Sequence, residues 1–222
     1  MRALFEDRWI PVGLDDQVKS ETVHPVVVNQ NGLAVWRSQN GTVQIWEDRC
    51  PHRGMRLSFG FVRGERLSCL YHGWQYETSG QCGHIPAHPD LVPPKTICVP
   101  SYAVRSHRGI LFANLAEAPK ASWPQADEPG WYSVRSIFVA VDVAMIRQYL
   151  GKADNALGAP ARMVDLDLYE MDASAVGRVS LALQPIDAGR TAIHITSNAA
   201  NADQRQQFAR QAVRMRRELE RK

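Results

Sequence analysis

The stretch Glu47–Tyr76, EDRCPHRGMRLSFGFVRGERLSCLYHGWQY, holds two short loops around which the chain is organised, and each loop carries one Cys and one His. One residue separates Cys50 from His52. Sixteen residues later, two residues separate Cys69 from His72, which gives the pattern C-x-H-x16-C-x2-H. Thiolates and imidazoles are preferred ligands of zinc and iron. The spacing therefore predicts a metal centre that joins the two loops.

Two metal centres fit two Cys and two His ligands. One is a tetrahedral structural zinc, and the other is a two-iron cluster with thiolates on one iron and imidazoles on the other. The ligand types alone leave both open. A disulfide between the two cysteines is a third possibility, and a chain without secretory features does not favour it.

The residues around the ligands resemble the Rieske [2Fe-2S] domain in its Rieske oxygenase form. CPHRG at residues 50–54 and CLYHGW at residues 69–74 match the two cluster-binding loops of that family, and the resemblance extends from about Trp9 to Leu115. It implies one [2Fe-2S] cluster per chain, with Cys50 and Cys69 on the inner iron and His52 and His72 on the outer iron. Neutral imidazoles in place of two thiolates raise the reduction potential of such a cluster.

The neighbours of the ligands suggest a tuned and shielded site. Gly54 and Gly73 predict tight turns whose amides approach the sulfurs. We expect Phe59, Tyr71 and Trp74 to keep water from the metal centre. The remaining cysteines, Cys82 and Cys98, receive no role. His84 and His88 do not predict a second metal site, because Pro86 prevents a helix that would align their rings.

Composition sets the class of protein. The chain has 222 residues, of which 45% are apolar and 22% are charged, enough for one large or two small domains. A net charge of +3 is too small to indicate nucleic acid. No apolar run is long enough for a membrane span, and residues 1–11 lack a secretory signal, so we expect a cytoplasmic location without a membrane.

The periodicity predicts a mainly β fold, α+β overall. Short β-rich runs before the first ligand loop are separated by Asn31-Gly32 and Asn40-Gly41, which predict hairpin turns. With the resemblance, residues 1–116 are expected to form an antiparallel Rieske β-barrel or sandwich. Residues 117–130 are rich in Pro, Ala and charged residues, which predicts a linker.

Residues 131–222 predict a second, smaller unit. A strand at 131–141, a helix at 142–150 capped by Asp142, and β runs at 163–171, 176–183 and 191–196 precede a C-terminal helix at 203–221. The helix has one apolar stripe, formed by Phe208, Ala212, Met215 and Leu219. The order resembles a shortened copy of the family's helix-grip domain, an antiparallel sheet with a C-terminal helix.

In the family, that second domain binds a mononuclear iron through two His and one carboxylate. The corresponding stretch here, residues 146–156, contains no His, and His194 is the only His after residue 107. We therefore expect no mononuclear Fe(II) site built from this chain alone.

Three functions fit these features. The favoured one is a Rieske-type component that passes single electrons from a flavin- or ferredoxin-type reductase to an oxygenase catalytic chain. The second is an active oxygenase whose iron uses ligands such as His194 with Asp154 or Asp165, or ligands from a neighbouring subunit in a homo-oligomer. The third is a binding or redox-sensing protein whose second half holds an apolar ligand. The basic face of the C-terminal helix is either solvated or contacts an acidic reductase; it comprises Arg205, Arg210, Arg214, Arg216, Arg217, Arg221 and Lys222.

Overall fold

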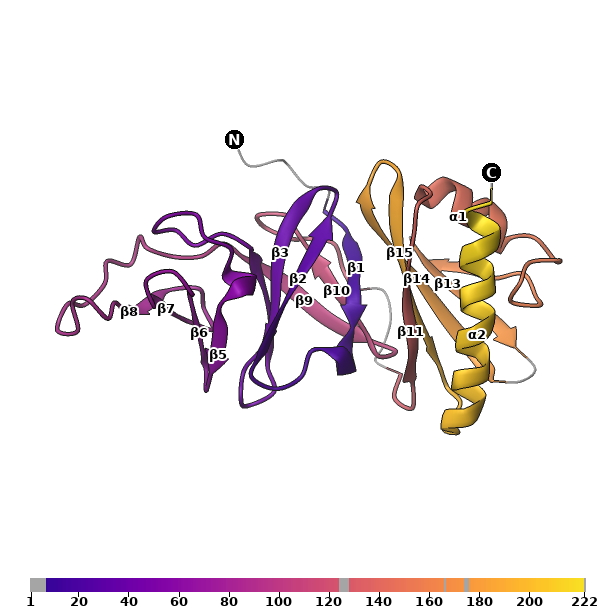
Figure 1. Cartoon of the computed structure of the whole chain (residues 1–222), viewed down its shortest axis with the longest axis horizontal. Coiled ribbons are helices and arrows are strands. Elements are labelled where there is room, and N and C mark those ends of the chain that lie inside the picture. Colours follow the sequence, from indigo (N-terminus) through magenta and orange to yellow (C-terminus); the bar gives the residue numbers. More distant parts are fainter. Residues whose placement is uncertain (1–6, 124–127, 166, 174–175, 222) are drawn as a thin grey trace.

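In the part of the chain that the structure describes, three antiparallel sheets and two α-helices are arranged along an elongated molecule (Figure 1). The structure is a computed structural model that describes residues 7–123, 128–165, 167–173 and 176–221. The predicted mainly β fold is confirmed. Among the described residues, no helix has the length and apolar character that a bilayer crossing requires.

A six-stranded sheet lies in the middle of the molecule. Its strands, in spatial order, are β1 (Trp9–Leu14), β10 (Ile110–Asn114), β9 (Ser101–His107), β4 (Val43–Glu47), β3 (Asn31–Arg37) and β2 (Thr22–Val28). A short 3-10 turn, η1 (Asp15–Gln17), follows β1. The sheet curls so that its two edge strands, β1 and β2, come near each other around a buried apolar core.

One of the two predicted hairpin turns is displaced. The Asn40-Gly41 turn between β3 and β4 is confirmed, but the β2–β3 turn lies at Asn29 and Gln30, whose φ angles of 46° and 66° are left-handed. The predicted turn residue Gly32 instead pairs with Val27 inside the hairpin. The amides of Asn29 and Gln30 donate to the carbonyls of Pro185 and Ile186 at 2.9 and 2.7 Å. These bonds join segments that lie far apart in the sequence, so the local preference of residues for hairpin turns could not predict them.

A smaller four-stranded sheet lies at one end of the molecule and carries the second ligand loop, whereas the first ligand loop follows β4 of the six-stranded sheet (Figure 1). Its strands are β5 (Phe61–Arg63), β6 (Arg66–Ser68), β7 (Gln75–Glu77) and β8 (Cys82–His84), and the 3-10 turn η2 (Leu57–Phe59) precedes them. Its core packs on the six-stranded sheet through Trp36, Trp46 and Tyr76, whose rings meet edge to face. Two sheets thus enclose the cysteine side chains from both sides.

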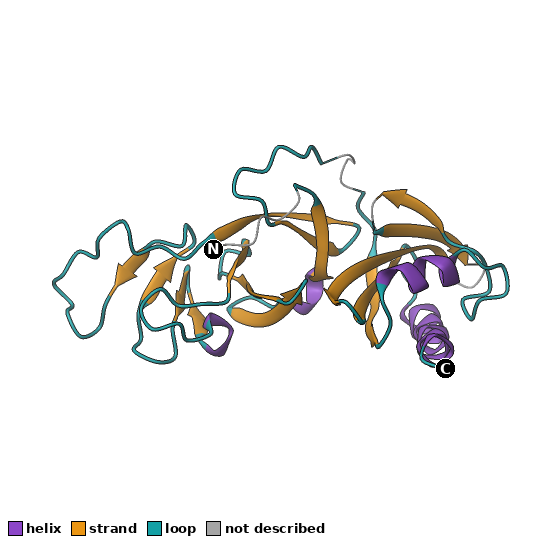
Figure 2. Ribbon diagram, turned by 90° about the horizontal axis from the view of Figure 1, so that it is seen from above, coloured by secondary structure: helices purple, strands orange, loops and turns teal. Residues whose placement is uncertain are grey.

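The third sheet has five strands and lies at the opposite end with both helices (Figures 1 and 2). Its order is β11 (Tyr132–Val139), β15 (Arg190–Ser197), β14 (Gly177–Asp187), β13 (Leu168–Ala173) and β12 (Arg162–Asp165); the helices are α1 (Val143–Leu150) and α2 (Ala202–Leu219). Asp142 caps α1 as predicted, accepting a hydrogen bond from the Met145 amide at 2.8 Å. The C-terminal helix spans 202–219 instead of 203–221, and its predicted apolar stripe is buried.

The single β run predicted at 163–171 is wrong. Two strands, β12 and β13, occupy this stretch and pair with each other as a hairpin. Asp167 has a left-handed φ of 62°, which a short polar side chain tolerates. Its buried carboxylate contacts Arg8 and Arg147, two residues that lie far away in the sequence. These ion pairs hold the turn, and strand alternation alone does not reveal them.

The two faces of the third sheet differ in chemistry. Odd-numbered residues of its long strands, such as Ile137, Leu181 and Ile193, pack beneath the helices. Even-numbered residues face the six-stranded sheet, and several of them are buried and polar, including Gln184 and His194. The junction between the two halves therefore combines hydrogen bonds and ion pairs with an apolar cluster that includes Phe112 and Leu168.

Candidate metal centre

The two ligand loops have the same backbone design. In the first, the Cys50 amide donates to the Met55 carbonyl at 2.8 Å and the Gly54 amide donates to the Cys50 carbonyl at 2.8 Å. The second loop repeats both bonds with Cys69: its amide donates to the Trp74 carbonyl and its carbonyl accepts from the Gly73 amide, at 2.9 and 3.0 Å.

Each loop closes through a glycine with left-handed φ, 73° at Gly54 and 69° at Gly73. Any other residue would be strained there, since a Cβ crowds the backbone in this conformation. The tight turns predicted at these glycines are thus present, although the bonds of their amides go to the cysteine carbonyls.

The four candidate ligands come together in two layers. Cys50 and Cys69 are buried in the core between the two N-terminal sheets. His52 and His72 lie outside them, with ring centroids 4.7 Å apart, and the His72 side chain is exposed. Burial, followed by the thiol of Cys50, raises the pKa of the Cys69 thiol. Burial and the nearby His72 and Arg53 lower the pKa of His52.

This arrangement fits a dinuclear cluster with two thiolates inside and two imidazoles outside. Each layer supplies two ligands of one kind, as a cluster with both sulfurs on one iron and both imidazoles on the other requires. Among the residues that the structure describes, no group of three or more His, Cys, Asp or Glu side chains could hold a single metal ion. A dinuclear cluster with two protein ligands per iron does not need such a group.

The predicted aromatic shield is only partly present. Trp74 stacks on the His52 ring with centroids 4.2 Å apart and planes 5° from parallel, which fixes the orientation of that imidazole. Tyr71 lies against His72, but its side chain is 58% exposed, and Phe59 is 54% exposed. Both residues thus lie at the surface, and shielding of the cluster by them stays a prediction.

Comparison with known proteins settles what these loops belong to. The family model of the Rieske [2Fe-2S] domain matches residues 8–103. These residues form a Rieske [2Fe-2S] domain. The match covers the six-stranded sheet up to β9, the four-stranded sheet and both ligand loops.

The curated relatives of this Rieske chain are much longer proteins. Oxidoreductase NdmD of Pseudomonas putida is 34% identical over 182 residues, which are 77% of this chain and 31% of the relative. Protein TIC 55 of Pisum sativum is 40% identical over 58% of this chain and 23% of the relative. The oxygenase subunit of a 5,5'-dehydrodivanillate O-demethylase from Sphingobium is 26% identical over 64% of this chain and 34% of its own length. The chain therefore spans about a third or less of these relatives.

Solved structures extend the likeness of fold beyond the Rieske domain. Apo dicamba monooxygenase aligns with 98% of this chain and 85% of its own chain at a TM-score of 0.73 and 18% identity. NdmA of Pseudomonas putida CBB5 with caffeine aligns with 96% of this chain and 81% of its own at a TM-score of 0.70 and 17% identity. The five-stranded sheet with its C-terminal helix thus shares the fold of Rieske oxygenases, as the sequence predicted.

Two residues that the sequence patterns did not indicate support the Rieske loops. The buried Asp48 carboxylate accepts from the amide and hydroxyl of Ser58, both at 2.7 Å, and from Arg56. It thereby ties the first loop to η2. Tyr76 Oη lies 3.1 Å from Cys50 Sγ. The alternation of β7, which turns Tyr76 inward, is the only sequence signal for this contact.

We expect Tyr76→Phe to lower the reduction potential of the cluster by on the order of 50 mV. A hydroxyl that donates to a cysteine sulfur stabilises negative charge, which increases on reduction. A spectroelectrochemical titration measures the change. Tyr149→Phe is the matched control, because the Tyr149 hydroxyl donates to Glu218 at 2.6 Å in the other half of the chain. An unchanged potential in Tyr76→Phe with full iron content would contradict the assigned contact.

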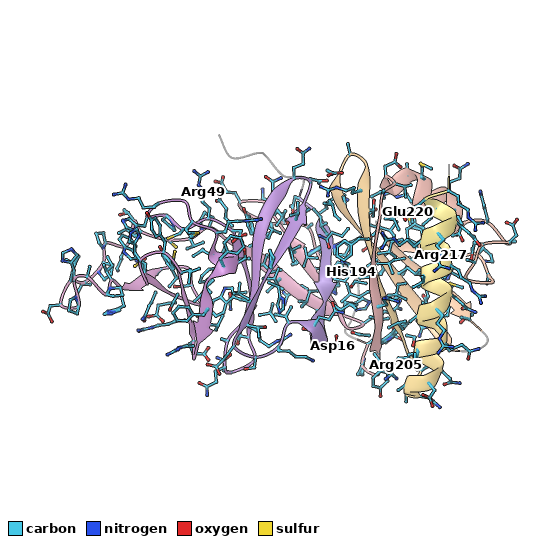
Figure 3. All side chains as sticks on the ribbon, viewed as in Figure 1. Asp16, Arg49, His194, Arg205, Arg217 and Glu220 are labelled. Carbon is cyan, nitrogen blue, oxygen red and sulfur yellow. The ribbon has the colours of Figure 1, made fainter. Side chains whose placement is uncertain are left out.

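His194 lies far from the ligand loops, at the junction of the two halves (Figure 3). Gln184 Nε2 donates to the Val27 carbonyl at 2.7 Å, so Gln184 Oε1 faces His194 Nε2 at 2.7 Å and must accept its proton. The other ring nitrogen, Nδ1, then accepts from the Ser136 hydroxyl at 2.9 Å. Both ring nitrogens are therefore occupied by neutral partners, neither of them Asp154 or Asp165.

Burial lowers the pKa of His194 from 6.5 to about 4. The folded state thus keeps this imidazole neutral at a pH where the unfolded chain protonates it. We expect a stability contribution of about 3 kcal/mol that is present above pH ~6.5 and is lost as the pH falls to ~4. Urea unfolding of the wild type and His194→Gln between pH 4 and 7.5 measures it. The wild type should lose more stability than the variant across this window, and parallel curves would show the prediction to be wrong.

Of the two remaining cysteines, Cys82 lies in the same buried core cluster as Cys50 and Cys69. Cys82 is buried and Cys98 is exposed, and both are free thiols. His84 is half-buried and His88 is exposed. Both follow the second ligand loop along the chain.

The basic face of α2 lies at the end of the molecule opposite to the Rieske loops (Figure 1). Figure 3 shows Arg205 and Arg217 on this helix and Arg49 on the side of the loops. Arg210, Arg214 and Arg217 line a shallow hollow with Arg135 of β11. Lys222, also predicted on this face, lies outside the described residues.

Proposed function

We propose that this chain is a one-electron carrier of the Rieske oxygenase class, in which Cys50 and Cys69 bind the inner iron of a [2Fe-2S] cluster and His52 and His72 bind the outer iron. The proposal is supported mainly by the two loops with matching hydrogen bonds, in which both thiols are buried, the His52 ring is half-buried and the His72 ring is exposed. When bound, the cluster takes up and releases single electrons. We also propose that residues 1–116 form the Rieske unit, 117–130 the connection and 131–222 the second unit.

The protein side chains have distinct tasks in this function. Burial of the thiols keeps water from the sulfur layer, and the Tyr76 hydroxyl supplies a donor to Cys50. Trp74 fixes the ring of His52, while the exposed His72 is the shortest route from the metal layer to the surface. Electron transfer weakens steeply with distance, so a redox partner must approach this end of the molecule.

We propose that the partner surface surrounds His72 and is matched by an acidic partner. Exposed apolar side chains, Leu70, Tyr71 and Phe61, lie in or beside the second loop. Exposed arginines, including Arg49 and Arg53, accompany the first loop. Apolar contacts with a charged rim are typical of transient protein interfaces. A reductase that donates electrons would dock here rather than on the basic face of α2, which lies at the far end (Figure 1).

An active oxygenase is the second candidate, because the second half has the fold of dicamba monooxygenase. Such an activity needs a mononuclear iron in addition to the cluster. The hydrogen bonds of His194 to Ser136 and Gln184 favour the carrier, since metal binding would require breaking at least one of them.

Iron content separates these candidates. Anaerobically purified protein should contain two irons per chain if it is a carrier and three if it is an oxygenase. The carrier should be reduced by a flavoprotein reductase and reoxidised on addition of an oxygenase catalytic chain. His194→Ala should leave the iron content unchanged. Three irons per chain, with one lost in His194→Ala, would overturn the carrier in favour of the oxygenase.

A further inference from the structure

A cavity of about 510 Å³ lies between the two halves of the chain, away from the Rieske loops. It opens where the edge strands β1 and β2 of the curled six-stranded sheet approach without pairing with each other. Buried side chains of that sheet, Val12, Val35 and Leu111, form its apolar floor. The opposite wall comes from the third sheet and carries Ser136, Gln184 and His194.

The size and chemistry of this cavity are those of a small-molecule site. Volumes of this order, a mostly apolar lining and a few converging polar groups distinguish ligand pockets from packing defects. The backbone of β1 also opens toward space here. Its pairing with β10 is interrupted between Pro11 and Gly13, and a Cβ built on Gly13 would meet no atom within 4 Å. An apolar ligand can therefore lie against the backbone at Gly13.

The hydrogen bonds of Ser136, Gln184 and His194 determine which polar group a ligand must bring to this part of the wall, which Arg190 also lines. The Gln184 side-chain NH2 group donates to the Val27 carbonyl, so the Gln184 side-chain oxygen accepts a hydrogen bond from His194 Nε2. His194 Nδ1 must then accept a hydrogen bond from the Ser136 hydroxyl, and this bond occupies the only proton of that hydroxyl. The Ser136 oxygen keeps acceptor capacity but has no second proton to donate. This wall therefore offers an acceptor to an incoming ligand.

Exposed residues stand at the mouth of the cavity. Phe138, on the same strand as Ser136, is 57% exposed although its ring lines the cavity. His24 and Pro25 of β2 lie at the rim and are also exposed. A ring that entered between Phe138 and β2 would cover an aromatic face that now meets water, and this burial would contribute to affinity.

We propose that this cavity is a binding site for a ring-sized, largely apolar molecule that carries one N–H or O–H donor, with Ser136 Oγ as the acceptor. The site is independent of the metal ligands, since none of them lines it. It is also separate from the core between the third sheet and α2, because the wall uses the even-numbered face of the sheet.

Indole and indene test the proposal, since they share shape and apolar area and only indole has an N–H group. Isothermal titration calorimetry on the full chain, with its cluster assembled, should give one site per chain and a Kd for indole on the order of 0.1 mM. Indole should bind about fivefold tighter than indene, the factor that one net hydrogen bond supplies. Absence of binding by both probes at millimolar concentration, or equal affinities, would overturn the proposal.

Two variants localise the binding. Gly13→Leu fills the cavity and should weaken the binding of indole at least tenfold. The control is Gly189→Leu, at another position with open space but in the exposed β14–β15 turn, which should leave the affinity for indole within twofold of the wild type. If Gly13→Leu does not fold, Gly13→Ala and Gly13→Val should each weaken the binding of indole, and the larger valine should weaken it more. Ser136→Val should remove the preference for indole over indene. Unchanged affinity in the folded Gly13 variants would overturn the site, and a retained preference in Ser136→Val would overturn the acceptor.

Discussion

The His72→Cys variant should retain a [2Fe-2S] cluster, but its reduction potential should fall by about 200 mV or more. A thiolate in place of a neutral imidazole adds negative charge to the cluster and makes electron uptake less favourable. The contrast between Rieske clusters and all-thiolate plant-type ferredoxins sets this scale. His72 should show the effect cleanly because its side chain is exposed, so the shorter cysteine does not leave a core cavity. Redox titration followed by electron paramagnetic resonance gives the potential and the identity of the cluster.

A matched control exists in the same half of the chain. His88 is also exposed and follows the ligand loops, and it belongs to neither of them. His88→Cys should leave both the potential and the iron content unchanged. If His72→Cys kept the potential of the wild type, or if zinc alone occupied the site in purified protein, His72 would not be a ligand of a [2Fe-2S] cluster and the proposed electron carrier would be wrong.

The Glu170→Gln variant should lose about 3–4 kcal/mol of folding free energy. Glu170 is buried at the junction of the two halves and accepts from Arg178 at 2.5 Å and Arg162 at 3.1 Å. Its other neighbour, Arg108, is buried as well, with Nη1 3.6 Å from the carboxylate. Removing the negative charge leaves the buried guanidinium of Arg108 with Glu128, 2.8 Å away, as its remaining anionic partner among the ion pairs described. Urea unfolding at neutral pH measures the loss.

An exposed ion pair provides the comparison for Glu170. Asp187 pairs with Arg190 at 2.6 Å, but the arginine side chain is 64% exposed. Solvent screens this pair, so Asp187→Asn should cost much less stability than Glu170→Gln. A loss of similar size in both variants would mean that burial of the Glu170 cluster does not strengthen it. That result would also remove the reason given for the polar junction between the sheets.

The sequence predicted well those features whose causes are local. The ligand loops close through hydrogen bonds between residues four or five positions apart, so Cys50 and Gly54, or Cys69 and Gly73, suffice to indicate them. The cap of α1 at Asp142 lies within three residues of its partner. Failures occurred where a distant segment decides the conformation. The turn at Asn29 and Gln30 depends on β14, and the turn at Asp167 depends on Arg8.

The residue order alone was enough to indicate the Rieske domain, the two ligand loops and the buried stripe of the C-terminal helix. The spacing of the Cys and His ligands and the helical period of the apolar residues are local patterns in the sequence, so predicting these features needs no knowledge of distant neighbours. Only the tertiary structure decided that Tyr76 reaches Cys50, that Glu170 meets Arg108, and that a cavity with Ser136 and His194 lies between the halves. Those contacts join residues far apart in sequence, and their formation depends on how the curled sheets pack, which no local pattern encodes.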